Sequence, residues 1–126
     1  MPKVLIIDDE QSIFDILVHM LKALGISPVW LPTGEEALVQ KTLQDHPDII
    51  GVLQDWSGRS RGLENAKLFA QIGMPVVIMS GREVEMIRSV LSREAVRVDG
   101  VISKPFRFQV IQDLVEKWQA KTPIGH

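Results

Sequence analysis

The chain has 126 residues, of which 14 are basic and 16 acidic, and its net charge is −2. The sequence contains no basic stripe that would predict nucleic-acid binding by this domain. Cysteine is absent, which excludes disulfides and thiolate metal sites. With 45% apolar and 24% charged residues, no run long enough to span a membrane and no signal peptide, the chain is expected to be one cytoplasmic domain.

The first apolar run, residues 4–7, leads directly into acidic residues. A short, wholly apolar run predicts a strand buried on both faces, as in a parallel sheet covered by helices. Asp8 and Asp9 follow at the carboxyl end of this strand, where adjacent carboxylates repel each other unless a positive group lies beside them. In open α/β sheets the ligand crevice lies outside the carboxyl ends of the strands. The opening of the chain therefore indicates where the chemistry lies.

Strand and helix patterns alternate along the rest of the chain. The alternation predicts a three-layer α/β sandwich around a parallel sheet, with the flavodoxin-like strand order 2-1-3-4-5. We expect one domain over residues 1–121 and a frayed tail over residues 122–126. The predicted strands cover residues 4–7, 28–31, 49–54, 75–79 and 100–103, and the predicted helices cover residues 13–24, 35–46, 63–72, 84–95 and 106–121.

Polar residues follow four of the predicted strands, and this topology brings them to one rim. Asp8, Asp9 and Asp55 are carboxylates, the hard oxygen ligands that Mg²⁺ prefers. A carboxylate can also attack a phosphoryl group and form an acyl phosphate. Asp55 is the candidate nucleophile, because it stands alone on its strand while Asp8 and Asp9 hold the cation. Lys104 would neutralise charge on the phosphate oxygens, and the hydroxyl of Ser80 would hydrogen-bond one of them.

Five motifs in this order resemble the receiver domain of two-component response regulators: residues 4–10, 34–38, 54–56, 79–81 and 103–106. The resemblance extends from Lys3 to about Lys117. It implies a phosphorelay switch that receives phosphate from a sensor histidine kinase or a histidine phosphotransfer protein, and it leaves open a homodimer formed through the fourth and fifth helices. It also implies the site roles: Asp8, Asp9, Asp55 and the Ser57 carbonyl bind Mg²⁺, Asp55 accepts the phosphoryl group, Ser80 and Lys104 bind it, and the Lys104-Pro105 bond is cis.

The chain departs from the family pattern at several positions. The usual spacing would put the acceptor at Leu53, so Asp55 comes two residues late; we retain Asp55 because the residues around it match the family's strand ending. The following loop is about one residue short and carries Arg59 and Arg61 instead of a Met-Pro pair. Val101 stands where the family has a Tyr or Phe that changes rotamer on phosphorylation.

The sequence leaves other functions open. One is a degenerate receiver that acts as a phosphorylation-independent interaction module. Others are a small Mg²⁺-dependent phosphohydrolase, which would need an acid where Ser57 stands, and a nucleotide-binding flavodoxin-like protein, which would need a glycine-rich loop after the first strand. Asp8 or Asp9 could also simply cap the following helix. As a receiver, the chain would be a substrate that assists its own modification, not a turnover enzyme.

Overall fold

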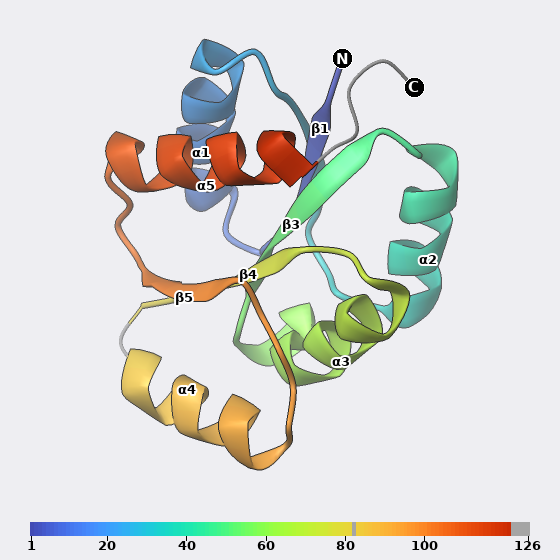
Figure 1. Ribbon diagram of the computed structural model, residues 1–126, viewed down its shortest axis with the longest axis vertical. Coiled ribbons are helices and arrows are strands. Elements are labelled where there is room, and N and C mark those ends of the chain that lie inside the picture. Colours follow the sequence, from blue (N-terminus) through green and yellow to red (C-terminus); the bar gives the residue numbers. More distant parts are fainter. Residues whose placement is uncertain (82, 122–126) are drawn as a thin grey trace.

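The computed structural model describes residues 1–81 and 83–121, so the predicted tail over residues 122–126 lies outside it. Within the described ranges, five strands form one parallel sheet in the order β2-β1-β3-β4-β5 (Figure 1). This order confirms the predicted fold class. The strands are β1 (Lys3–Ile7), β2 (Ser27–Leu31), β3 (Ile49–Asp55), β4 (Val76–Ser80) and β5 (Gly100–Ser103).

The helices follow the strands in alternation, as the sequence predicts. Helix α4 ends two residues before its predicted end, because Ala95 adopts a left-handed backbone with φ 56° that no helix can continue. In the part of the chain that the structure describes, no helix has the length and apolar character required to cross a bilayer. The helices are α1 (Gln11–Ala23), α2 (Glu36–Asp45), α3 (Gly62–Ile72), α4 (Val84–Arg93) and α5 (Phe108–Lys121), with a 3₁₀ turn at Gly58–Ser60.

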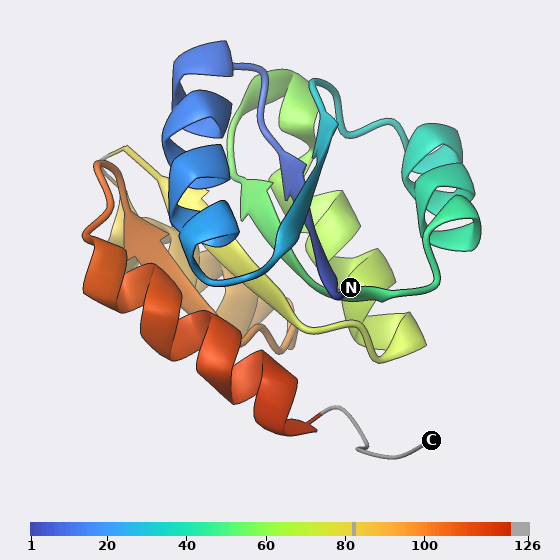
Figure 2. The ribbon, with the colours of Figure 1, turned by 90° about the horizontal axis from the view of Figure 1, so that it is seen from above.

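Strand β1 divides the core between the two faces of the sheet. Its residues alternate in direction: Leu5 and Ile7 pack toward α2, α3 and α4, whereas Val4 and Ile6 pack toward α1 and α5. All four side chains have no solvent exposure. Figure 2 shows α1 and α5 on one side of the sheet and α2 and α3 on the other. The prediction of a strand buried on both faces is confirmed.

Helix α5 approaches β3 closely at one glycine. A Cβ atom added to Gly51 would collide with the indole ring of Trp118, so the helix can lie at this distance only because residue 51 has no side chain. The Trp118 ring is 1% exposed, and its Nε1 donates a hydrogen bond to Asp99 Oδ2 at 2.9 Å. This contact fixes the C-terminal part of α5 against the amino ends of β3 and β5.

Candidate functional site

The predicted site residues lie where four strands end. Asp8 follows β1, Asp55 is the last residue of β3, Ser80 is the last residue of β4, and Lys104 follows β5. The parallel registers of the strands bring these ends to the same edge of the sheet. The Lys104 backbone N–H donates to the Ser80 carbonyl at 2.8 Å, and the bond to Pro105 is cis, as the resemblance implies.

The ammonium group of Lys104 joins carboxylates from two strands. Its Nζ donates to Asp8 Oδ2 at 2.7 Å and to Asp55 Oδ1 at 2.8 Å, and Glu10 Oε1 lies 3.4 Å away. The side chains of Asp8, Asp55 and Lys104 are 0%, 4% and 10% exposed. The structure therefore brings three of the predicted site residues into direct contact in a nearly dry pocket, where charge interactions are strong.

Burial and these contacts together shift the pKa values of the Asp8 carboxyl and the Lys104 ammonium. Burial raises the pKa of the Asp8 carboxyl above its ordinary value, and the nearby Asp55 charge adds to this, although hydrogen bonds from Lys104 and from the Glu10 backbone oppose it. Burial disfavours the Lys104 ammonium, but the hydrogen bonds and charges of Asp55 and Asp8 outweigh burial and raise the pKa of Lys104 to about 12. Lys104 thus stays charged at neutral pH.

Three consecutive acids form a compact oxygen cluster beside this lysine. Asp8, Asp9 and Glu10 each offer one carboxylate oxygen, and these oxygens lie within 4.8 Å of one another. Asp8 is buried, whereas Asp9 and Glu10 are exposed. The cluster consists of the hard oxygen donors that suit Mg²⁺, with room for water ligands on the exposed side. Glu10 was not among the predicted ligands; its signal in the sequence is that it directly extends the acid pair.

The alternative that one of the two aspartates caps α1 is wrong. The N-cap residue of α1 is Glu10, and its side chain makes no capping hydrogen bond. Asp8 Oδ1 instead accepts a hydrogen bond from the Glu10 backbone N–H at 2.9 Å, which fixes the turn between β1 and α1. One Asp8 carboxylate oxygen therefore accepts a hydrogen bond within this turn, and the other accepts one from Lys104.

A tryptophan that the sequence analysis did not assign to the site supports the same turn. Trp30 Nε1 donates to the Asp8 carbonyl at 2.8 Å, and the Asp8 N–H donates to the Leu31 carbonyl at 3.2 Å. The Trp30 ring is stacked on Phe14 of α1, with ring centroids 4.7 Å apart. An aromatic residue in an edge strand gives no sign in the sequence that its indole reaches a neighbouring loop.

The loop after Asp55 is a 3₁₀ turn that folds back over the carboxylate. The Ser57 hydroxyl donates to Asp55 Oδ2 at 2.9 Å, and the Ser57 carbonyl accepts the Ser60 N–H at 3.0 Å. A carbonyl oxygen has two lone pairs, so this hydrogen bond leaves one available for a cation. A hollow of about 210 Å³ opens here, and its lining residues are Asp55, Trp56, Ser57, Ser80, Gly81 and Glu83. The Ser80 hydroxyl accepts the Glu83 N–H at 3.2 Å.

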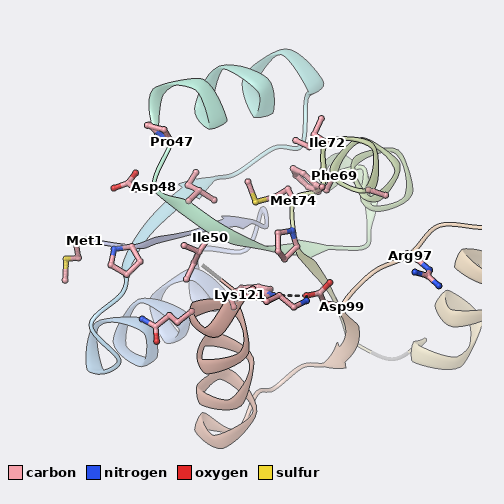
Figure 3. Close-up of a pocket in the computed structure, with 17 residues that line it drawn as sticks. Met1, Pro47, Asp48, Ile50, Phe69, Ile72, Met74, Arg97, Asp99 and Lys121 are labelled. Atoms are coloured by element: carbon pink, nitrogen blue, oxygen red, sulfur yellow. Dashed lines mark hydrogen bonds and ion pairs between the residues drawn. The ribbon is translucent and has the colours of Figure 1, made fainter. Parts of the chain in front are cut away.

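A larger hollow of about 1050 Å³ lies at the opposite, amino end of the strands. Figure 3 shows apolar side chains such as Ile50, Phe69 and Met74 around it, with an ion pair between Lys121 and Asp99 at its rim. None of the predicted site residues is among those that line it. The acidic cluster, not this hollow, is therefore the candidate site for phosphate and metal chemistry.

The family model of the response regulator receiver domain matches residues 4–116. The chain belongs to this family. Receiver domains are the phosphoacceptor switches of two-component signalling, which agrees with the resemblance found in the sequence. This receiver domain carries its acid cluster, its acceptor candidate and its lysine at the expected edge of the sheet.

Relatives and solved structures agree with this assignment. The alkaline phosphatase synthesis transcriptional regulatory protein PhoP of Bacillus subtilis is 32% identical over 106 residues, which are 82% of this chain and 42% of that regulator. The chain thus spans less than half the length of that relative. Chemotaxis protein CheY4 of Vibrio cholerae has a TM-score of 0.76 at 22% identity, covering 93% of this chain and 98% of that one. A receiver domain protein of Clostridium thermocellum has a TM-score of 0.78 at 20% identity, covering 96% of both chains. At these identities the structural likeness concerns the fold.

Proposed function

We propose that Asp55 is the phosphoacceptor of this receiver domain, and that its donor is a sensor histidine kinase or a histidine phosphotransfer protein. A carboxylate oxygen of Asp55 attacks the phosphorus of a phosphohistidine on the donor. The bond between phosphorus and the imidazole nitrogen breaks, the imidazole takes up a proton, and an aspartyl phosphate forms.

The observation that carries this proposal is the contact of 2.8 Å between Lys104 Nζ and Asp55 Oδ1 at the edge of the small hollow. Phosphoryl transfer needs fixed positive charge near the phosphoryl oxygens, and a lysine held charged beside the nucleophile supplies it. The hydroxyl groups of Ser57 and Ser80 line the same hollow, which has room for a phosphoryl group. We assign to Ser80 the hydrogen bond to a phosphate oxygen.

We assign Mg²⁺ to the carboxylates of Asp8, Asp9 and Asp55 and to the main-chain carbonyl of Ser57, with Glu10 beside them. The carboxylate oxygens of Asp8, Asp9 and Glu10 lie within 4.8 Å of one another, which supports a divalent cation bound by Asp8 and Asp9. When bound, Mg²⁺ would neutralise charge on the phosphoryl oxygens. The residues of this chain supply the nucleophile, the second positive charge and the hydrogen bonds.

We further infer that the domain is a substrate of phosphotransfer and not a turnover enzyme. Two positions after Asp55, Ser57 uses its hydroxyl to hydrogen-bond Asp55 Oδ2, and a serine cannot act as the second acid of an aspartate-based phosphohydrolase. We place the protein in the cytoplasm, where ATP charges histidine kinases. Exposed apolar side chains on α4 and α5, namely Met86, Phe108 and Val110, support a homodimer through these helices.

Intact mass after incubation with phosphoramidate and Mg²⁺ tests the acceptor. We expect one phosphoryl adduct on the wild-type protein, no adduct on Asp55→Asn, and no adduct when EDTA removes the metal. Release of phosphate from a stable phosphomonoester, which is not an activated phosphoryl donor, would favour a phosphohydrolase. A folded wild-type protein that takes up no phosphoryl group would contradict the proposal and favour the interaction module.

A further inference from the structure

Two buried amide side chains lie directly behind residues 56–61, the loop between β3 and α3, which we call the acceptor loop. Gln54 precedes Asp55 in β3 and Asn65 lies in the first part of α3; they are 0% and 2% exposed. A buried amide is costly unless its hydrogen bonds are satisfied, so its partners show what it holds. Apart from Gln54 Oε1, the acceptors of these hydrogen bonds are main-chain carbonyls, and those of Ser60 and Gly34 lie outside the strands and α-helices.

Gln54 fixes both ends of the acceptor loop. Its Nε2 donates to the Asp55 carbonyl at 2.8 Å and to the Ser60 carbonyl at 2.6 Å. The Trp56 N–H, which follows, donates to the Met79 carbonyl in β4 at 3.0 Å. The Gln54 side chain therefore connects Asp55, which precedes the loop, with Ser60, which ends the 3₁₀ turn.

Asn65 completes the arrangement from the helix side. Its Nδ2 lies 3.0 Å from the Ser60 carbonyl, 3.0 Å from the Gly34 carbonyl and 3.2 Å from Gln54 Oε1, so three acceptors surround this one nitrogen. The Gly34 N–H in turn donates to the Arg59 carbonyl at 2.8 Å. A Cβ added to Gly34 would collide with the Ser60 carbonyl, which shows how closely the two loops pack.

The loop needs such support, because its own residues supply little. Ser57, Gly58 and Arg59 are exposed, so the loop buries few apolar groups. Arg61 has φ 54°, a left-handed conformation that residues with side chains rarely adopt and that persists only when surrounding contacts hold it. Gln54 and Asn65 both donate to the carbonyl of Ser60, the residue directly before Arg61.

We infer that Gln54 and Asn65 are positioning residues that set the place of the Ser57 carbonyl relative to the Asp55 carboxylate. Ser57 lies between the two anchored points, and its carbonyl accepts the N–H of Ser60, the residue that both amides hold. This inference rests on the proposed function, in which the Ser57 carbonyl and Asp55 bind Mg²⁺. Residues that orient metal ligands commonly contribute tenfold or more to metal affinity.

Calorimetric titration of Mg²⁺ tests this assignment on the metal-free full chain, with Gln54→Met, Asn65→Leu and the milder Asn65→Ala. Gln54→Met and Asn65→Leu fill the space with an apolar group and lose the donors, whereas Asn65→Ala loses the donors without adding a larger apolar group. The control is Leu21→Ala, which removes fully buried atoms of α1 in the other half of the core and lowers stability without touching the loop. The rate of phosphorylation by phosphoramidate is measured in parallel over a range of Mg²⁺ concentrations.

We expect the Mg²⁺ dissociation constant to rise about tenfold in the amide variants and to stay at the wild-type value in Leu21→Ala. At saturating Mg²⁺ the phosphorylation rate of the amide variants should return close to that of the wild type. Wild-type Mg²⁺ affinity in Asn65→Ala, or an equal loss in Leu21→Ala, would overturn the assignment while leaving Asp55 as the acceptor. A wild-type protein that is phosphorylated without Mg²⁺ would overturn the metal assignment and, with it, this inference.

Discussion

Lys104 contacts carboxylates that belong to different strands and are separated by 47 positions in the chain, Asp8 and Asp55. Both carboxylates are almost fully buried, and among the described residues Lys104 is the basic residue that pairs with them. Removal of one partner from a buried ion pair leaves an uncompensated charge, which costs far more than loss of a surface pair. At the scale of single residues, Lys104 therefore neutralises the carboxylates of Asp8 and Asp55, which a bound cation would also neutralise.

Lys104→Met should lower the free energy of unfolding by about 3 kcal/mol in the absence of metal. Lys67→Met, at an exposed ion pair with Glu94, should cost much less stability because solvent screens such a pair, and it is the matched control. Mg²⁺ should raise the melting temperature of Lys104→Met more than that of the wild type, because the two carboxylates have then lost the Lys104 ammonium. Equal Mg²⁺-induced shifts in the two proteins would contradict this account.

The predicted site residues that the structure brings into contact are those that stand next to a strand in the chain. Asp8, Asp55 and Lys104 follow or end apolar runs, and a parallel topology brings such positions together. Trp30 and Asn65 gave no such signal, because a strand aromatic is expected to pack and a helix asparagine is expected to face solvent. Their roles depend on which loop each side chain reaches, and that is decided by tertiary structure.

At the scale of elements, the approach of α5 to β3 depends on Gly51. The Trp118 ring occupies the place where a side chain at residue 51 would lie. Gly100 in β5 offers a comparison within the same sheet, because a Cβ added there would meet its nearest neighbour, Val77 Cγ2, at an ordinary distance of 3.9 Å. The two glycines therefore differ in the space around them and not in secondary structure.

Gly51→Ala should lower stability by about 2 kcal/mol, because α5 must shift away from β3 or the Trp118 ring must leave its place. Gly100→Ala should be close to neutral. Urea unfolding of both variants, followed by tryptophan fluorescence, measures the difference. If Gly51→Ala were as stable as Gly100→Ala, the close packing of the indole on β3 would be wrong.

An ion pair between neighbouring helices provides a test by pH. Lys67 of α3 donates to Glu94, just after α4, at 2.8 Å, and this hydrogen bond and the lysine charge hold the pKa of Glu94 below its ordinary value of 4.5. A lowered carboxylate pKa stabilises the fold above the ordinary value, and this contribution disappears as the pH falls through the lowered pKa. Wild type should therefore exceed Glu94→Gln in stability at neutral pH, and the difference should vanish in acid.

Urea midpoints of the two proteins between about pH 3 and pH 7 measure this difference. Lys41 and Asp45, an exposed ion pair within α2, provide a control, because Asp45→Asn should show no comparable loss of contact between helices. A difference between wild type and Glu94→Gln that stays constant down to the lowest pH would contradict the ion pair.

At the scale of the whole molecule, the sheet separates two ends with different properties. Its carboxyl end gathers the acids, the lysine and the small hollow, and its amino end holds the larger apolar hollow. The parallel sheet could be predicted, because each apolar run is short and each is followed by a helical pattern, and its strand order followed from the flavodoxin-like topology. The ends of helices could not be predicted to the residue, since positions such as Ala95 adopt left-handed conformations that tertiary contacts decide.

We expect the phosphoryl group to be transferred to Asp55, although the family spacing points to Leu53. The most direct measurement is reduction of the phosphorylated protein with borohydride, which converts an aspartyl phosphate to homoserine, followed by peptide sequencing by mass spectrometry. Cleavage at Lys41 and Arg59 releases one peptide that holds Asp45, Asp48 and Asp55, so fragmentation distinguishes them. We predict homoserine at residue 55. Homoserine at another aspartate, or none in a protein that carries the adduct, would contradict the account.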